Sequence, residues 1–215
     1  QAFYKIMILT ISGVDIDIKE NAGLSLSGGA DSAILAYILL KYSKSKVHFF
    51  TTASLQKEIV TITYSSNVLK KCAELTNNYN FEHHIDYVQE QKRDVFFKNL
   101  LSKIENNNNL DVIYTATTNT PPFEEFINFK EKLPTDIIMR RNPLVVKPLM
   151  SNEDKLYHPL INFDKKKIKD LYIEENVLDS LFPLTRSCES NTSYSSHCGN
   201  CWWCQERIWA FSKLS

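Results

Sequence analysis

The chain has 215 residues and carries 25 basic and 25 acidic side chains, so its formal net charge is zero. This balance gives no electrostatic reason for binding nucleic acid or an anionic membrane. The apolar run at residues 33–40 stops at Lys41 and is too short to span a bilayer. We therefore expect a cytoplasmic protein of one large or two small domains, with no membrane partner.

Apolar runs typical of strands and of helices alternate along the first two thirds of the chain. Strands are predicted within residues 1–10 and at 23–27, 46–52, 81–88, 111–117 and 144–149. Helices are predicted at residues 31–42, 56–76, 94–104 and 122–132, and the region from Asp164 onward is predicted to be largely helical. This alternation predicts an α/β fold with a parallel sheet that helices cover on both faces.

A short polar segment, SGGADS at residues 27–32, separates the first strong strand from the first helix. Its glycines let the backbone approach an anion, and the helix N-terminus contributes unpaired N–H groups. Asp31 would repel phosphate by itself, so its expected role is to hold Mg²⁺. The alternative, a turn with Ser and Asp caps, explains one polar residue rather than the set. No lysine follows the glycines, which excludes the Walker-type phosphate loop.

The segment resembles the SGGxDS signature of the PP-loop ATP pyrophosphatases. The resemblance implies a Rossmann-like fold of the adenine nucleotide alpha-hydrolase type. It also implies ATP binding, transfer of AMP to a substrate oxygen and release of pyrophosphate. The residues expected to contact ATP are Leu26, Ser27, Gly28, Gly29, Ala30, Asp31, Ser32 and, at the end of the second strand, Thr51.

Four of the five cysteines lie near the C-terminus with the spacing C-x9-C-x2-C-x2-C. The spacing predicts that Cys188, Cys198, Cys201 and Cys204 hold one structural zinc ion. Two disulfides are the rival interpretation, which the size of the chain and the lack of a visible secretory signal disfavour. Cys72 stands alone in a helix-like stretch and is predicted to be a small buried residue.

The tail also resembles one family. Residues 185–188 read T-R-S-C and residues 198–207 read C-G-N-C-W-W-C-Q-E-R, similar to the T-x-S-C and C-G-x-C-x-x-C-x-x-R segments of the 7-cyano-7-deazaguanine synthase (QueC) family. Residues 158–161 resemble its P-L-I segment. The resemblance implies an AMP-forming ligase of queuosine biosynthesis. It would adenylate a 7-carboxy-7-deazaguanine-like substrate, and a nitrogen nucleophile, free ammonia or another amine, would displace AMP to give an amide or a nitrile.

Polar residues at two further places are candidates for the acceptor and transition-state sites. Thr115 and Asn119 follow the predicted fourth strand and are expected to line the substrate pocket. Arg186 precedes a predicted zinc ligand and is a candidate for contacting phosphate, with a plain surface arginine as an equal alternative. Lys147 and Lys165 are weaker candidates of the same kind. The predicted catalytic set is Asp31, Ser32 and Arg186.

One part of the family pattern is missing. The QueC family has an Asp-Cys-Arg segment after the fourth strand, whereas residues 119–125 here read N-T-P-P-F-E-E. The acceptor could therefore be a macromolecule, a protein or an RNA, as in a defence system; the neutral charge argues mildly against RNA. A non-catalytic nucleotide-binding subunit is disfavoured by the intact Asp31. A homodimer or a partner protein is left open.

The expected organisation has two parts. Residues 1–149 are predicted to form the nucleotide-binding core, and residues 150–215 a helical extension that carries the four-cysteine site. The sequence contains no internal repeats and no long linker between these two parts.

Overall fold

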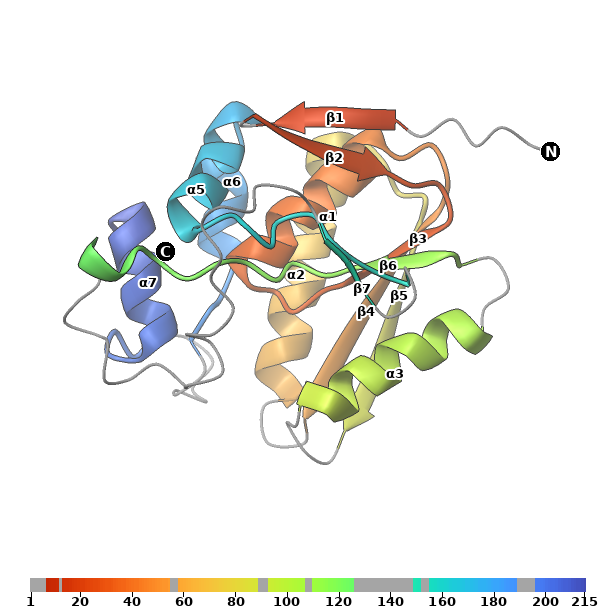
Figure 1. The fold of residues 1–215 in the computed structure, drawn as a ribbon. Helices are drawn as coiled ribbons and strands as arrows, with labels where there is room; N and C mark the ends of the chain where they lie inside the picture. The colour runs from red at the N-terminus through yellow and green to blue at the C-terminus, as the bar shows by residue number, and fades with distance from the viewer. Residues whose placement is uncertain are drawn as a thin grey trace.

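The computed structural model describes residues 7–11, 13–54, 58–88, 93–106, 110–125, 149–151, 155–188 and 196–215. These residues form a six-stranded sheet in the order β5-β4-β3-β6-β8-β7 (Figure 1). Neighbouring strands run parallel except for β7, which pairs antiparallel with β8 at one edge. The strands are β3 (Ala22–Ser25), β4 (Val47–Ser54), β5 (Phe81–Val88), β6 (Val112–Tyr114), β7 (Leu149–Ser151) and β8 (Leu156–His158).

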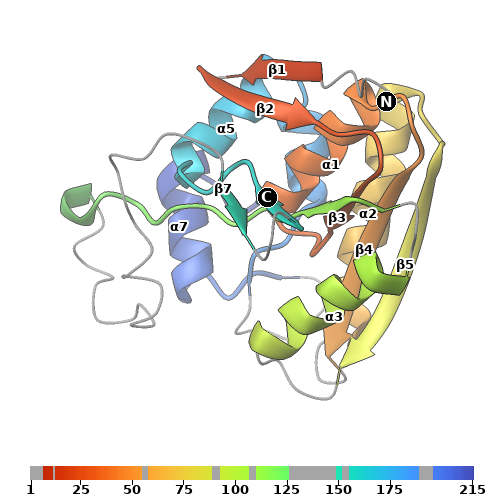
Figure 2. The same cartoon turned by 45° about the vertical axis from the view of Figure 1, so that its right-hand side comes forward.

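Helices lie on both faces of this sheet (Figure 2). Phe49 of β4 packs in the core cluster under the first two helices, whereas the next residue, Phe50, packs with Leu100 of the third. The sheet is therefore mostly parallel and covered on both faces, which confirms the predicted α/β, Rossmann-like class. The helices are α1 (Ala30–Tyr42), α2 (Glu58–Thr76), α3 (Arg93–Asn106), α5 (Lys165–Glu174), α6 (Leu178–Leu181) and α7 (Trp202–Phe211).

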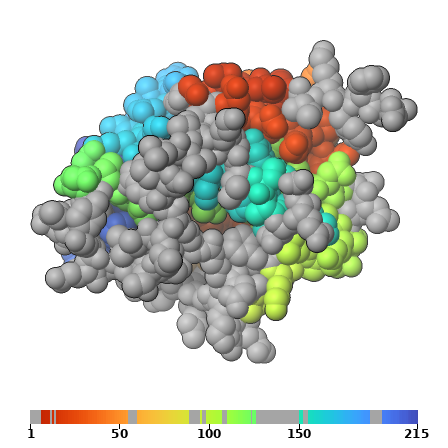
Figure 3. All heavy atoms as spheres, viewed as in Figure 1, coloured from red at the N-terminus to blue at the C-terminus, as the bar shows by residue number. Residues whose placement is uncertain are grey.

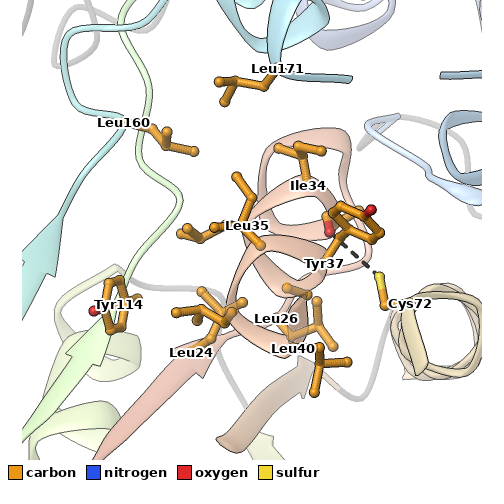
Figure 4. Packing of buried hydrophobic residues seen from close by; sticks show 14 of the residues in the cluster. Leu24, Leu26, Ile34, Leu35, Tyr37, Leu40, Cys72, Tyr114, Leu160 and Leu171 are labelled. Atoms are coloured by element: carbon orange, nitrogen blue, oxygen red, sulfur yellow. Dashed lines mark hydrogen bonds between the residues drawn. The ribbon is translucent and has the colours of Figure 1, made fainter. Parts of the chain in front are cut away.

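Helix α1 is the centre of the hydrophobic core. Each of its residues from 32 to 40 is buried, so it is enclosed around its whole circumference by other elements. Cys72 of α2 is buried against it, with its Sγ 3.7 Å from the carbonyl oxygen of Ala33, which confirms the prediction for this cysteine. Figure 4 shows side chains from β3, α1, α2, β6 and α5 meeting in this cluster.

A hairpin of β1 (Met7–Ile11) and β2 (Val14–Ile18) lies beside the main sheet, and the sequence predicts only its first strand. Ile16 and Ile18 are buried in the main core. The Tyr114 hydroxyl donates to the carbonyl oxygen of Asp17 at 2.5 Å and accepts from the Lys19 N–H at 2.9 Å. These contacts fasten the hairpin, which forms the upper edge of the surface in Figure 3.

The C-terminal third continues the same sheet and core. β7 and β8 extend the sheet beyond β6, and α5 packs against both α1 and α7. The Tyr172 hydroxyl of α5 donates to the Ala30 carbonyl oxygen at 2.7 Å. The division at residues 149 and 150 stays a prediction, and its two parts share one sheet.

Some predicted elements differ in extent. Strand β6 ends at Tyr114 rather than at residue 117. A 3₁₀ turn, η1 (Phe123–Glu125), lies at the start of the helix predicted for residues 122–132. The rest of that helix, Lys147 and most of the strand predicted at 144–149 lie outside the described residues. A second 3₁₀ turn, η3 (Phe182–Leu184), follows α6.

Candidate functional site

The strand order places the two main candidate segments side by side. From β3 the chain moves outward through β4 to β5, and β6 then returns to the other side of β3. In open α/β sheets ligands bind at such a switch point, beyond the carboxyl ends of the strands. Residues 27–32 follow β3, residues 115–119 follow β6, and Leu24 is paired with Tyr114 at the ends of these two strands.

The SGGADS loop is closed by its own serine hydroxyls. The Oγ atoms of Ser27 and Ser32 lie 3.0 Å apart, and the Gly29 N–H donates to Ser27 Oγ at 3.2 Å. The buried Ser32 hydroxyl donates to the Gly29 carbonyl oxygen, also at 3.2 Å. Helix α1 begins at Ala30, directly after Gly29, so the last three residues of the SGGADS segment form its first turn. The arrangement is a compact turn that ends in a helix N-terminus, a structure able to bind phosphate.

Gly28 is the residue of this loop whose Cα has no room for a side chain. Its φ of +78° is in the left-handed region, which favours glycine. A Cβ atom there would lie 2.7 Å from the Ser65 nitrogen and 2.8 Å from atoms of Tyr64, both in α2. The loop is therefore packed directly onto the backbone of α2.

Gly28→Ala is expected to lower both stability and ATP affinity, because α2 must move away from the loop. The positive φ alone costs about 1–2 kcal/mol, and the clash with α2 adds to this. Gly13→Ala is a matched control, since Gly13 has a φ of +75° and a Cβ atom there would meet nothing within 4 Å. Equal losses in free energy of unfolding for the two variants, measured by denaturant titration, would show that the packing against α2 has no effect.

Thr51 supports the loop from within the sheet. It is fully buried, its hydroxyl donates to the Leu26 carbonyl oxygen at 2.9 Å, and the same oxygen of Thr51 lies 2.8 Å from Nε2 of His83. Leu26 is itself buried and donates its N–H to the Phe50 carbonyl oxygen at 2.8 Å. These contacts fix where β3 ends, whereas direct contact of Thr51 or Leu26 with ATP stays a prediction.

Asp31 forms a partly buried ion pair that the sequence does not predict. Its Oδ2 accepts a hydrogen bond from Nζ of Lys165, the first residue of α5. Lys165 Nζ also lies 3.5 Å from Thr118 Oγ1 and 4.0 Å from Glu206 Oε2. Lys165 therefore joins the phosphate loop, the segment after β6 and helix α7 at one point.

The second carboxylate oxygen of Asp31, Oδ1, is buried and has no hydrogen-bond partner among the described residues. An unsatisfied carboxylate oxygen beside a phosphate-binding turn has the chemistry that Mg²⁺ requires of a ligand. The residue thus fits the predicted magnesium role.

Burial and neighbouring charges have opposite effects on the pKa values of Lys165 and Glu206, which lie together beside Asp31. Burial lowers the pKa of Lys165, but the nearby carboxylates of Asp31 and Glu206 outweigh it, so the pKa is raised overall and the ammonium form persists. Burial raises the pKa of Glu206 to about 7, with the attraction of Lys165 opposing part of the shift. Lys165 therefore stays positively charged beside the SGGADS loop, with the carboxylate of Asp31 as its counter-ion.

Arg186 is buried, so the alternative of a plain surface arginine is wrong. Its backbone N–H donates to the Gly28 carbonyl oxygen at 2.9 Å, which links the cysteine-bearing segment to the phosphate loop. Its guanidinium donates to the Ser196 carbonyl oxygen at 2.7 Å and lies 5.6 Å from the ring centroid of Tyr64. A catalytic role for its side chain stays a prediction.

The segment after β6 is ordered by contacts with β8. Thr115 Oγ1 lies 2.5 Å from Nδ1 of His158, whose Nε2 lies 2.7 Å from Ser151 Oγ. Burial lowers the pKa of His158 and thereby favours the neutral imidazole. Asn119 is buried, and its Oδ1 accepts the N–H of Thr120 at 3.0 Å. Both predicted substrate residues thus shape this segment, and their contact with an acceptor stays a prediction.

The four C-terminal cysteines meet at one point. Their Sγ atoms all lie within 4.8 Å of one another, and those of Cys198 and Cys204 are 3.9 Å apart. Zinc–sulfur bonds of about 2.3 Å place the sulfurs of a tetrahedral site about 3.8 Å apart. Backbone N–H groups of Cys198 and Cys201 donate to the sulfurs of Cys188 and Cys198. None of these four cysteines forms a disulfide in the structure, and the cluster can hold a metal ion such as zinc.

Arg207 fixes the segment that carries Arg186 and Cys188. It is 1% exposed and donates to the carbonyl oxygens of Phe182 at 3.1 Å and Thr185 at 3.2 Å. Its guanidinium also lies 3.8 Å from the ring centroid of Phe182. The arginine of the C-terminal motif therefore holds the segment that leads to Arg186 and Cys188 against α7.

Among the described residues, no helix combines the length and apolar character that crossing a bilayer requires.

In comparisons with known proteins, different family models match the two parts of the chain, each over less than half of its length. The family model of the queuosine biosynthesis protein QueC matches residues 124–215, and that of asparagine synthase matches residues 18–105. The first match contains Lys165 and the cysteine cluster, and the second contains the phosphate loop. No curated protein sequence matches the chain. Among solved structures it is similar to NMN synthetase from Francisella tularensis, with 14% identity, a TM-score of 0.43 and coverage of 91% of this chain and 79% of that one.

Proposed function

We propose that this chain, a QueC-like protein of the PP-loop ATP pyrophosphatases, transfers AMP from ATP to a carboxylate acceptor and releases pyrophosphate. One observation carries the proposal: Lys165 Nζ contacts Asp31 in the phosphate loop and lies 3.5 Å from Thr118 in the segment after β6. A single cation thus stands where an ATP phosphate chain and an acceptor would meet.

In this proposal the β- and γ-phosphates bind the turn at residues 27–32. The N-terminus of α1 would face the phosphate oxygens, as at other helix N-termini that bind anions. Asp31 would hold Mg²⁺ through Oδ1, and the ion when bound neutralises charge on the polyphosphate. Because ATP brings its own negative charge, Lys165 can exchange its bond to Asp31 for one to a phosphate oxygen.

The first chemical step joins a carboxylate oxygen of the acceptor to the α-phosphorus and breaks the bond from that phosphorus to the bridging oxygen. The electron pair leaves with pyrophosphate, so negative charge grows on the oxygens nearest the loop. In this proposal Lys165 and the N-terminus of α1 stabilise this charge. The acceptor is held beside residues 115–119, and the protein acts by positioning and charge rather than by proton transfer.

In the second step ammonia attacks the acyl carbon, the bond to AMP breaks and an amide forms. A nitrile follows if the amide oxygen then attacks the α-phosphorus of a second ATP, which releases a second pyrophosphate. The carbon–oxygen bond then breaks, the oxygen leaves as part of AMP, and the nitrogen loses its two protons. We propose a 7-carboxy-7-deazaguanine-like compound as the acceptor, supported by the QueC match over residues 124–215. The zinc of the cysteine cluster has a structural role, since four thiolates leave no position open.

The proposal predicts AMP and pyrophosphate, not ADP and phosphate, as the products of ATP. Purified protein with Mg-ATP, ammonia and 7-carboxy-7-deazaguanine is expected to release AMP and to give a product with the mass of the amide or nitrile. Omitting the deazaguanine provides the control. ADP as the main product would refute the adenylation chemistry. AMP release that ignores the deazaguanine but responds to a protein or RNA fraction would assign a macromolecular acceptor instead.

A further inference from the structure

A second group of metal-binding side chains lies on the sheet face that α3 partly covers. His48 is in β4, and Glu82 and His84 are in β5, the edge strand of the sheet. The parallel register pairs His48 with Glu82 and Phe50 with His84. Since side chains two residues apart share a face, all three project from the same side of the two strands.

The donor atoms form a nearly regular triangle. His48 Nδ1 lies 3.2 Å from His84 Nε2 and 3.6 Å from Glu82 Oε2, and the distance from His84 Nε2 to Glu82 Oε2 is 3.7 Å. Bonds of about 2.0–2.2 Å from zinc to nitrogen or oxygen place the donors of a tetrahedral site about 3.3–3.6 Å apart. The triangle therefore needs only small movements to accept an ion.

We propose that His48, Glu82 and His84 bind one divalent transition-metal ion of the zinc class, with a fourth position open to solvent. Two imidazoles and one carboxylate form a donor set that suits zinc and its neighbours rather than magnesium or calcium. Side-chain exposures of 15%, 46% and 38% for His48, Glu82 and His84 leave the site accessible from outside.

Neighbouring side chains hold two of the ligands in place. Lys46 donates to the other carboxylate oxygen of Glu82 at 2.7 Å, which directs Oε2 toward the histidines. The ring of His84 is stacked on that of Phe50 at a centroid distance of 4.9 Å. Contacts of this kind orient ligands in metal sites. The charge of Lys46 opposes the cation, but this side chain is 49% exposed and water screens it.

The site is separate from the proposed active site. His48 and Glu82 are the second residues of their strands, whereas the phosphate loop lies beyond the carboxyl ends of the sheet. A metal ion bound by these three side chains would link β5 to β4 in addition to their backbone hydrogen bonds. Because the ion binds only the folded state, it would stabilise this edge of the sheet. The inference does not rest on the proposed function, and either can fail without the other.

The test uses protein whose cysteine cluster is already filled with zinc, with excess metal removed and one ion per chain verified by elemental analysis. Titration with Zn²⁺ in a calorimeter is expected to show one further ion per chain and a rise in Tm. His48→Gln and His84→Gln are each expected to weaken this second affinity at least tenfold and to abolish the rise in Tm. His83→Gln is the matched control, because His83 lies between two of the ligands in sequence but on the opposite face, beside Thr51.

Two results would overturn the proposal. One is the absence of a second binding event in wild-type protein. The other is a second event whose affinity is the same in wild type, His48→Gln and His84→Gln, which would place the ion elsewhere. Far-ultraviolet circular dichroism of each variant verifies that the fold is retained.

Discussion

Asp31→Asn is expected to slow AMP release at least about a hundredfold while leaving the chain folded. The variant keeps the size of the side chain but loses the charge that a magnesium ligand requires, and its Oδ1 is the buried oxygen without a hydrogen-bond partner among the described residues. Removing the Asp31 charge also removes one cause of the raised pKa of Glu206, so this carboxyl group, 4.0 Å from Lys165, can ionise and compensate the buried ammonium. Single-turnover measurement of AMP separates this effect from slow product release.

Glu175→Gln is the matched control for Asp31→Asn. Glu175 accepts from Lys41 at the opposite end of α1, so this variant also loses a carboxylate next to the helix without touching the loop. It is expected to release AMP at the wild-type rate. If Asp31→Asn retained wild-type activity at saturating Mg²⁺, the magnesium role proposed for Asp31 would be wrong.

Cys201→Ser is expected to release the zinc and to lower Tm by about 10 °C or more. Structural zinc sites contribute on the order of 10 kcal/mol of binding free energy. Losing about 3 kcal/mol of this already shifts Tm by roughly 10 °C in a chain of this size. Elemental analysis and thermal unfolding of the purified variant measure the two effects. The variant is also expected to bind ATP more weakly, because Cys188 follows closely on Arg186, whose N–H holds the Gly28 carbonyl oxygen.

Cys72→Ala is the control for Cys201→Ser. Cys72 is buried in the core at α2 and lies outside the cysteine cluster, so its loss leaves a small cavity but no vacant ligand position. Its zinc content is expected to equal that of wild type. Full zinc in Cys201→Ser, or loss of zinc in Cys72→Ala, would contradict the assignment of the ligands.

Two elements are predicted almost to the residue, for different reasons. Helix α1 begins one residue before its predicted start, because a continuous buried apolar run has few alternatives in this fold. Strand β5 has its predicted bounds although its sequence mixes apolar and polar residues and none of them is buried. The hairpin strand β2 is missed, although its sequence V-D-I-D-I alternates as a half-buried strand should. It is short and directly follows another strand, so the expected strand–helix alternation leaves no place for it.

The parts of the site that are local in sequence can be predicted, and those that need tertiary contacts cannot. The phosphate turn and the cysteine cluster each lie within a short segment. The ion pair between Asp31 and Lys165 instead joins residues 134 positions apart, through the packing of α5 on α1. The sequence ranks Lys165 only as a weak candidate. It places Thr118 in the polar segment expected to line the pocket but gives no indication of its contact with Lys165, and it gives no indication of the role of Glu206.

The same limit applies to the direction of side chains. The sequence singles out Arg186 for its guanidinium, yet the contact with the loop is made by its backbone N–H. The adjacent histidines at 83 and 84 indicate one core-facing and one solvent-facing ring, but the approach of His84 to His48 depends on the register between two strands. A register cannot be deduced from one strand alone, because a shift of one residue would turn every side chain to the other face.

The hydrogen bond from the Arg186 N–H to the Gly28 carbonyl oxygen has a consequence for the synthesis of the protein on the ribosome. A ribosome adds about 5–20 residues per second, so the loop at residues 27–32 emerges several seconds before the partners that complete it. Lys165 is absent until α5 has been synthesised, and the N–H that donates to Gly28 is absent until Arg186 has been added. The cysteine cluster is complete only when α7 has followed. We therefore expect nucleotide affinity to appear abruptly, only after α7 has left the ribosome, and stalled chains that stop before residue 186 to be unable to retain ATP.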